Sequence, residues 1–239
     1  MSTLELIWDA HTRYKLWSWT NGSTHYVAHV IRRLNGRPHI FTVRIGARGT
    51  ATVPTSNTDE CASVAVVKMA STPEAAEALA REAQVYAQLA GVQGIAVPRC
   101  FGHFHGRVGG KEVVCLVLEY CAGFPGEQMQ DPHRQIMFSA YALHAQGIMH
   151  GDLLSGRHFV KSGRAMMILD FAAAVPHHCL HGKRVLGPDG RPGRGVCPEL
   201  AALEQSYGVY RRSERHSKRG ASDDDDDLEH TRGRGGVYR

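Results

Sequence analysis

The chain has 239 residues, of which 43% are hydrophobic and 21% charged, with six cysteines and a formal net charge of +5. This length allows a sizeable core in one or two domains, and the hydrophobic fraction is typical of a globular protein. The longest apolar runs, such as residues 113–118, are far shorter than the roughly 20 residues of a membrane helix, and the N-terminus has no signal-peptide pattern. The cysteines lack CxxC spacing, which favours reduced thiols. We therefore expect an intracellular protein, cytoplasmic or nuclear, without a membrane partner.

The positive charge does not indicate a nucleic-acid partner once it is divided along the chain. Residues 211–239 hold eight Lys or Arg and seven Asp or Glu, which leaves 20 against 16 in the rest. This modest excess forms no basic stripe and argues against nucleic-acid binding. The stretch 211–239 has few large apolar residues and is predicted to be disordered, either as a solvated tail or as an interaction arm.

Residues 14–118 are predicted to form mostly strands. Two β-branched runs, 25–34 and 39–47, flank an Asn-Gly turn and predict a hairpin. The polar stretch 48–60 has the composition of a surface insertion, after which 61–70 continues as a strand. Residues 71–91 predict a helix, with Ser71 and Glu74 as a capping box.

Glu82 lies within the apolar stripe of this helix, between Leu79 and Tyr86. A buried carboxylate needs a partner, because leaving it unpaired costs several kcal/mol. Lys68 is the nearest upstream candidate, since it follows the apolar run 64–67. We expect Lys68 and Glu82 to pair; the alternative is that Lys68 reaches solvent and Glu82 lies on the edge of the stripe.

The second half of the chain is predicted to contain helices, loops and short strands. The apolar strand 111–118 ends at Glu119, and a helix that begins at Asp131 breaks at Gly147. A His-Gly-Asp loop at 150–152 follows, and the apolar strand 165–169 leads into Asp170-Phe171.

This order of elements resembles the protein-kinase-like superfamily over residues 20–205. The stretches "REAQVYAQLAGVQGIAVPRCFGHF", "HGDLLSGRHFV", "DFAAAVPHHC" and "CPEL" resemble the divergent kinase-like proteins expanded in fungi. The resemblance implies a bilobal α+β fold. Its parts would be an N-terminal segment 1–13, a β-rich N-lobe 14–118 with one long helix, a hinge and shortened helical C-lobe 119–210, and the tail 211–239.

The resemblance also implies an ATP site. Lys68 would steady the α- and β-phosphates of ATP, and Glu82 would hold Lys68 in place. Backbone groups from Glu119 to Cys121 would hydrogen-bond the adenine, with Leu118 behind them.

The residues of the chemical step follow from the same resemblance. Asp152 would be the catalytic residue that accepts the proton of the substrate hydroxyl, and Asp170 would bind Mg²⁺ beside the phosphates. His150 would support the loop; the alternative is a surface histidine.

Several positions depart from the kinase pattern. Arg157 stands where an asparagine usually binds the second metal ion, and a guanidinium has no lone pair for Mg²⁺, although it can bind a phosphate oxygen. Leu154 replaces a lysine, Ala172 replaces the glycine of Asp-Phe-Gly, and Gly22 is a weak substitute for a glycine-rich loop. Glu199 is the candidate for the glutamate that closes the activation segment.

Three functions therefore stay open. The first is weak transfer of the ATP γ-phosphate to a Ser/Thr-type hydroxyl of an unknown protein. The second is a pseudokinase that binds nucleotide and a protein partner without phosphate transfer. The third is a small-molecule kinase, because enzymes of the aminoglycoside-phosphotransferase type also carry His-Gly-Asp.

A zinc site is a separate alternative. The potential ligands are His177, His178, Cys179, His181 and Cys197. Their adjacent spacing is unlike that of closed structural sites, so a surface histidine cluster or local packing competes with this interpretation. Cys179 as a nucleophile lacks an organised partner in the sequence.

Overall fold

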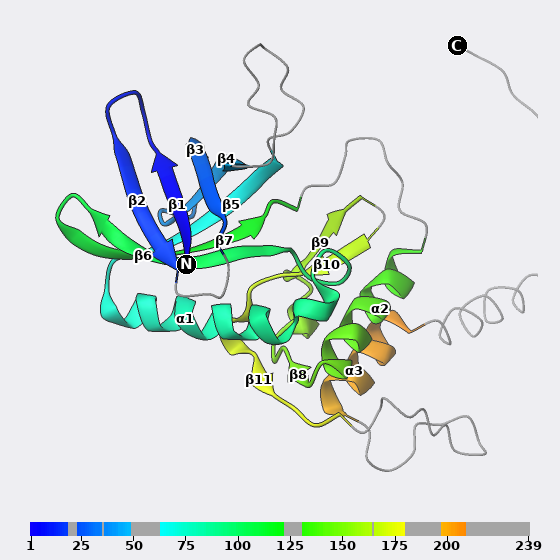
Figure 1. The fold of residues 1–239 in the computed structure, drawn as a ribbon. Helices are drawn as coiled ribbons and strands as arrows, with labels where there is room; N and C mark the ends of the chain where they lie inside the picture. The colour runs from blue at the N-terminus through cyan, green and yellow to red at the C-terminus, as the bar shows by residue number, and fades with distance from the viewer. Residues whose placement is uncertain are drawn as a thin grey trace, which may run out of the picture.

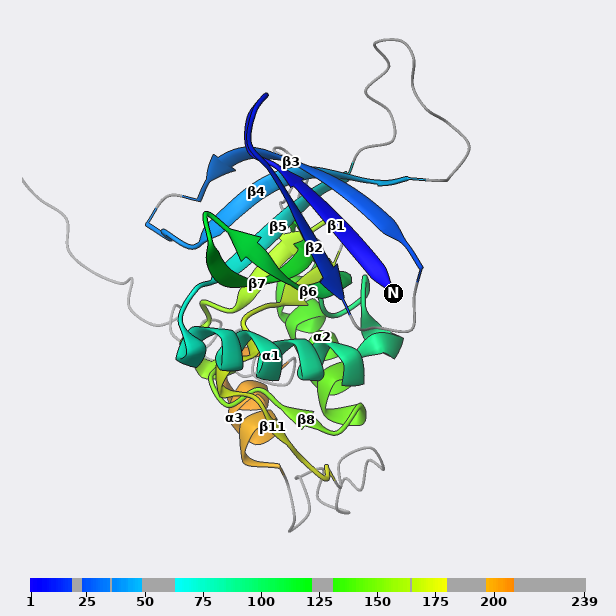
Figure 2. The same cartoon turned by 60° about the vertical axis from the view of Figure 1, so that its left-hand side comes forward.

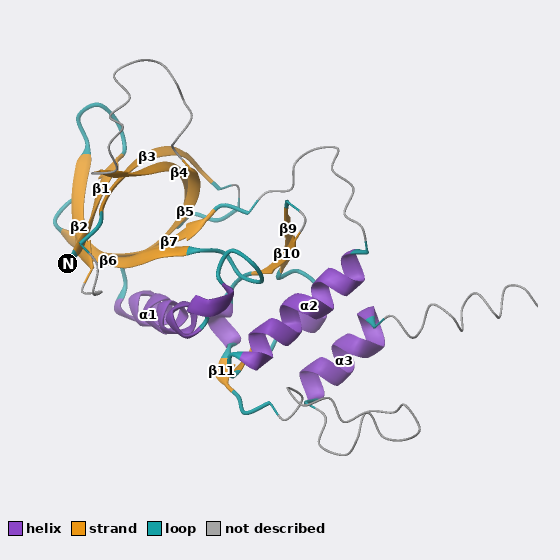
Figure 3. Ribbon diagram, turned by 45° about the vertical axis from the view of Figure 1, so that its right-hand side comes forward, coloured by secondary structure: helices purple, strands orange, loops and turns teal. Residues whose placement is uncertain are grey.

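The computed structural model describes residues 1–18, 23–34, 36–48, 63–121, 131–163, 165–179 and 197–208. Seven strands in this part of the chain close into a barrel in the order β1-β2-β6-β7-β5-β4-β3 (Figure 3). They are β1 (Ser2–Ile7), β2 (Arg13–Ser18), β3 (His25–Arg33), β4 (Ile40–Arg48), β5 (Ser63–Ala70), β6 (Cys100–Val108) and β7 (Lys111–Glu119). The predicted hairpin is confirmed as the antiparallel pair of β3 and β4.

The bilobal kinase-like fold that we expected is wrong, because the strands form a closed barrel and not the β-rich lobe of a two-lobed protein. The strand β1 completes the ring, since it pairs antiparallel with β2 and parallel with β3. It lies within residues 1–13, which the expected fold treated only as a leading segment. Its buried Leu4 and Leu6 fill the barrel interior and explain why this segment joins the sheet.

The barrel closes between β2 and β6, where Leu16 pairs with Gly106 and Trp17 pairs with His105. A Cβ atom at position 106 would lie 2.9 Å from both the Lys15 carbonyl oxygen and Leu16 Cγ. Such contacts are too short for a side chain, so glycine permits the close approach of the two strands.

Two hydrophobic cores follow from the alternation of side chains along the strands. On β7, Val113, Cys115 and Val117 fill the barrel, while Leu116 and Leu118 face the second core outside it. The second core lies between the barrel and the helices and also contains the fully buried Tyr86, Leu89, Leu143 and Leu200.

Three α-helices in the described residues lie on one side of the barrel: α1 (Pro73–Gln88), α2 (Pro132–Ala145) and α3 (Pro198–Tyr207) (Figures 1 and 2). The helix α1 lies against β5, β6 and β7, and α2 packs on α3. Both predicted helices are confirmed, but Thr72 and not Ser71 caps α1, accepting a hydrogen bond from the amide of Ala75.

Two short sheets complete the structure. They are the antiparallel pairs β9 (Phe159–Ser162) with β10 (Ala165–Ile168), and β8 (Ile148–Met149) with β11 (Val175–Pro176). None of the described helices is long and apolar enough to span a membrane. Gly22, most of the expected insertion at 48–60, His181 and the tail 211–239 lie outside the described residues.

Candidate functional site

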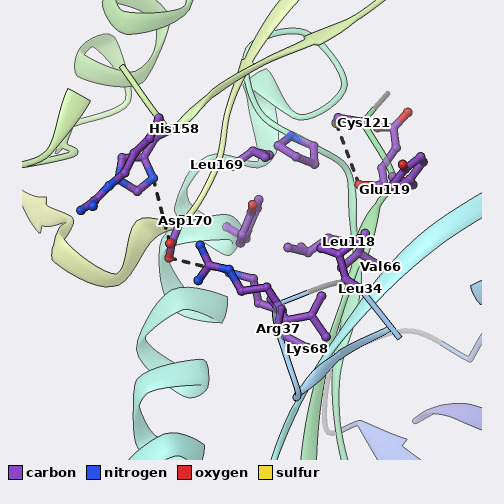
Figure 4. A pocket seen from close by; sticks show the side chains of 15 residues that line it. Leu34, Arg37, Val66, Lys68, Leu118, Glu119, Cys121, His158, Leu169 and Asp170 are labelled. Carbon is purple, nitrogen blue, oxygen red and sulfur yellow. Dashed lines mark hydrogen bonds and ion pairs between the residues drawn. The ribbon is translucent and has the colours of Figure 1, made fainter. Parts of the chain in front are cut away.

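A pocket of about 570 Å³ opens on the outer face of the barrel beside β5 and β7 (Figure 4). Its apolar lining consists of Leu34, Ile40, Val66, Pro98, Leu118 and Leu169. Its charged and titratable lining consists of Arg37, Lys68, Tyr86, Glu119, Tyr120, Cys121, Arg157, His158 and Asp170. This volume and mixed lining are typical of a site for a small molecule or cofactor.

Lys68 points into this pocket because of its register on β5. Ala65 and Val67 are buried inside the barrel, so the alternating Val66 and Lys68 face outward. Lys68 Nζ donates hydrogen bonds to both carboxylate oxygens of Glu82, at 2.7 and 2.9 Å. The predicted ion pair between strand and helix is therefore confirmed.

Glu82 is almost fully buried, with 4% of its surface exposed, whereas the Lys68 side chain remains 19% exposed. Glu82 thus lies beneath Lys68 and holds its ammonium group at the pocket surface. A buried carboxylate in this place is stable only with such a partner, which explains the charge inside the apolar stripe of α1.

Asp170 lies two residues after the end of β10 and lines the pocket next to Leu169. One carboxylate oxygen is 3.8 Å from Lys68 Nζ and the other is 4.0 Å from His158 Nδ1 (Figure 4). The side chain is 42% exposed. Neither contact is a tight hydrogen bond, so the oxygens remain accessible to a ligand.

The backbone around Asp170 is held by neighbouring groups. Asp170 itself has a positive φ of 66°, which is unusual for a residue other than glycine. The buried His150 ring donates from Nε2 to the carbonyl oxygen of Leu169 at 3.0 Å, since its Nδ1 accepts from the amide of Asp152. Burial lowers the pKa of His150, which keeps the ring neutral at neutral pH. The predicted supporting role of His150 is confirmed.

Asp152 lies beside the pocket, where two lining residues contact it. Arg157 Nη2 is 2.5 Å and His158 Nε2 is 2.9 Å from its Oδ2. The hydrogen bond from His158 and then that from Arg157 lower the pKa of Asp152 to about 2. The carboxylate is therefore ionised throughout the physiological pH range.

His158 connects the two aspartates, a role that sequence reasoning did not assign to it. Its Nε2 is also 3.1 Å from Arg157 Nε. A protonated Nε2 donates to Asp152, whereas an unprotonated Nε2 accepts from Arg157, so the ring serves one of these partners at a time.

Glu199 fixes the loop that carries Asp152. Its carboxylate accepts hydrogen bonds from the amides of His150 at 3.0 Å and Gly151 at 2.7 Å, and contacts His144 Nε2 at 2.8 Å. Burial would raise the pKa of Glu199, but these hydrogen bonds, led by the one from His144, lower it below its ordinary value. The first turn of α3 is thereby tied to the His-Gly-Asp loop.

The end of β7 differs from the expected adenine-binding hinge. The amide of Glu119 donates to the Arg99 carbonyl at 2.8 Å, and the amide of Tyr120 donates to the Val64 carbonyl at 3.2 Å. Both amides are thus engaged within the protein. The Glu119 carbonyl is approached by Cys121 Sγ at 3.9 Å, and both residues line the pocket.

The structure thus brings Lys68, Glu119, Cys121, Arg157 and Asp170 to one pocket. Glu82 stands behind Lys68, and Asp152 is reached through Arg157 and His158.

Arg37 and Tyr86 are pocket residues that sequence reasoning missed. Arg37 lies in the turn between β3 and β4, which forms one wall, and the predicted hairpin alone could have drawn attention to it. The buried hydroxyl of Tyr86 has no hydrogen-bond partner within the described residues, although Tyr86 borders the pocket.

Comparison of the sequence with models of known protein families finds no match, and comparison with curated proteins finds none either. Functional inference for this chain therefore rests on the pocket itself.

Proposed function

We propose that the pocket binds ATP with Mg²⁺ and that the chain transfers the γ-phosphate to a hydroxyl group of a protein substrate. One observation carries this proposal: the Lys68 ammonium, held by Glu82, lies 3.8 Å from the exposed carboxylate of Asp170 in a pocket with an apolar half. The proposal rests on these side chains and not on the kinase-like fold.

The two halves of the pocket suit the two halves of a nucleotide. Leu34, Val66 and Leu118 offer apolar surface to a purine, while Lys68 and Arg37 offer positive charge to phosphates. Asp170 supplies carboxylate oxygens, which Mg²⁺ prefers when it is held jointly by one or two carboxylates and substrate phosphates. When bound, Mg²⁺ neutralises charge on the phosphates.

Asp152 would orient the acceptor hydroxyl and take its proton. The hydroxyl oxygen forms a bond to the γ-phosphorus, the bond to the β-phosphate oxygen breaks, and ADP leaves. Within the described residues, Arg157 and His158 both contact Oδ2 of Asp152, which leaves Oδ1 for the hydroxyl. A pKa near 2 makes this carboxylate a weak base, which agrees with slow transfer.

A second candidate is a module that binds nucleotide without phosphate transfer. The short contact between Arg157 and Asp152 favours it, because the guanidinium neutralises the carboxylate and replaces a metal-binding amide. A small-molecule hydroxyl as the acceptor is the third possibility, and the transfer assay below distinguishes it.

Binding is tested by thermal unfolding with and without Mg-ATP. We expect Mg-ATP to raise Tm, Asp170→Asn to reduce the shift, and Lys68→Met to reduce it further. Asp9→Asn is the matched control, since Asp9 is exposed and does not line the pocket. Absence of any shift at millimolar Mg-ATP would contradict nucleotide binding.

Transfer is tested with γ-labelled ATP, protein acceptors and small hydroxyl compounds. We expect label on protein hydroxyls with the wild type, and a large loss with Asp152→Asn at unchanged ATP affinity. Equal background in both proteins would favour the binding module, and label on small compounds alone would favour the small-molecule kinase.

A further inference from the structure

A cluster of nitrogen and sulfur ligands lies on the far side of Glu199 from the His-Gly-Asp loop. It contains His144, His177, Cys179 and Cys197, and one potential ligand atom from each lies within 4.8 Å of those of the others. His144 comes from α2, His177 and Cys179 follow β11, and Cys197 directly precedes α3. We propose that these four residues form a structural Zn²⁺ site that fastens α3 to α2 and to the segment after β11.

The ligand set is the one that closed structural zinc sites use, namely two cysteines and two histidines. Zinc bonds of about 2.3 Å to sulfur and 2.0–2.1 Å to nitrogen place tetrahedral ligands roughly 3.3–3.8 Å apart. Cys197 Sγ and His144 Nδ1 are already 3.5 Å apart. Because all pairs of ligand atoms lie within 4.8 Å, the widest pairs must contract by at most about 1.5 Å to reach these distances.

The hydrogen bonding of His144 prepares its ring for a metal ion. Nε2 lies 2.8 Å from the Glu199 carboxylate, so the proton belongs on Nε2 and the lone pair on Nδ1 faces Cys197. A histidine whose second nitrogen donates to a carboxylate is the common arrangement around protein-bound zinc.

The side chain of His177 gives an independent reason to place a metal ion in this cluster. Its Nε2 is buried and has no hydrogen-bond partner within the described residues, and its ring lies edge-on to that of His144 with centroids 5.2 Å apart. A buried unpaired nitrogen is costly, and bonding to a metal ion would satisfy it.

The charges balance on binding. Zn²⁺ binds two neutral imidazole nitrogens and two thiolates, and the two thiol protons are released to solvent. The ion and its four ligands, of which His144 and Cys197 are buried, then carry no net charge. Neither Cys179 nor Cys197 is in a disulfide, so both are thiols that can lose a proton to bind the ion.

The site would also close a long chain loop. Cys179 and Cys197 are 18 positions apart in the sequence, and a metal bridge between them removes conformational entropy from the unfolded chain. It would hold the first turn of α3, and with it Glu199, against the loop that carries Asp152. This inference does not depend on the proposed phosphotransfer.

The test uses the full chain, purified under reducing conditions, with metal content and Co²⁺ absorption as readouts. We expect one Zn²⁺ per chain. Replacement by Co²⁺ should give the visible bands of a tetrahedral ion and thiolate-to-cobalt charge transfer. Cys179→Ser and Cys197→Ser should weaken the charge-transfer band and His177→Gln should weaken binding, while Glu199→Gln should lower affinity about 10- to 100-fold.

His178→Gln and Cys100→Ser are the matched controls, because His178 adjoins two of the ligands in sequence and Cys100 is partly buried like Cys179, yet neither belongs to the cluster. Both should bind Co²⁺ like the wild type. Where a serine variant does not fold, removal of zinc from the wild type by a chelator must lower Tm, and added Zn²⁺ must restore it. An octahedral Co²⁺ spectrum, no metal-dependent Tm, or equal loss in the controls would overturn the proposal.

Discussion

The Arg157 guanidinium lies 2.5 Å from the carboxylate of Asp152, five residues earlier in the same loop. The Arg157 side chain is 70% exposed, so solvent screens the attraction, but the contact still places a fixed cation against the candidate catalytic group. The loop therefore holds Asp152 in its ionised, weakly basic form.

The pKa of Asp152 checks this arrangement directly. It is about 2 in the native protein, against an ordinary value of 3.8, and His158→Gln or Arg157→Gln should raise it. Because the folded-state pKa is depressed, Asp152 stabilises the fold above pH 3.8, and that contribution is lost as the pH falls toward 2. Carboxyl NMR titration gives the pKa; an unchanged value in both variants would contradict the assigned contacts.

The Lys68–Glu82 pair predicts a strong coupling energy. Lys68→Met should reduce the free energy of unfolding by about 3 kcal/mol, because it leaves Glu82 buried without a partner. Adding Glu82→Leu should recover much of the loss. The exposed pair Arg81–Glu77 has the same 2.7 Å distance and is the control; its coupling should be only about 0.3–0.5 kcal/mol. Coupling energies are measured by denaturant unfolding of the single and double variants. Similar values for the two pairs would show that burial does not strengthen the Lys68–Glu82 pair.

Gly151 should tolerate no side chain. It has a φ of 86°, and a Cβ atom would lie 2.8 Å from the Ala173 carbonyl oxygen. Gly151→Ala should therefore cost about 2–4 kcal/mol of stability, from strain and steric conflict together. Gly163→Ala, with a φ of 55° and open space around it, should cost about 1 kcal/mol. Equal losses in thermal unfolding would mean that the backbone angle alone matters.

Cys121 should be an unreactive thiol that nucleotide protects further. Burial, and then the charge of Glu119, raise its pKa to about 11, so little thiolate exists at pH 8. Alkylation followed by peptide mass spectrometry should show slow labelling that accelerates as the pH approaches 11. Mg-ATP should slow labelling at Cys121 but not at Cys100, which does not line the pocket. If Mg-ATP protected neither cysteine, or both equally, the result would argue against nucleotide binding beside Cys121.

Removing the hydroxyl group should change the free energy of unfolding in opposite directions at Tyr86 and Tyr141. The Tyr86 hydroxyl is buried without a partner in the described residues, so Tyr86→Phe should raise the free energy of unfolding by about 1 kcal/mol. Tyr141 donates to Glu204, and Tyr141→Phe should lower it by about 1 kcal/mol. Loss of stability in Tyr86→Phe would indicate an unseen water or protein partner.

Lys68 and its partner Glu82 could be predicted from the residues alone, because each breaks a local pattern. Glu82 interrupts an apolar helix face and Lys68 ends an apolar strand, and burial of charge requires a partner. Asp152 and Asp170 were expected only from the resemblance to the kinase-like superfamily, as were Glu119, Cys121 and Arg157. Local physical chemistry therefore predicted the ion pair at the pocket, and the resemblance supplied the other residues.

The closed barrel could not be predicted in the same way. The alternation of side chains identifies a strand and its buried face, but it does not say which strand pairs with which. The ring depends on the parallel pairing of β1 with β3 and on the short contact of β2 with β6, both of which join separate parts of the chain. His144 was missed in the metal cluster for a similar reason, since it lies 33 positions before His177 in the sequence.

The joint at Gly106 has a consequence for how other proteins can recognise the barrel. With β2 and β6 paired there, each of the seven strands has a neighbouring strand on both sides and the ring has no edge strand. A partner, including a second copy of the chain, therefore finds no edge strand beside which to add a strand of its own. Recognition of the barrel must therefore work through side chains. A substitution at position 106 that separates β2 from β6 would change this, because both strands would become edge strands to which a strand of another chain can pair.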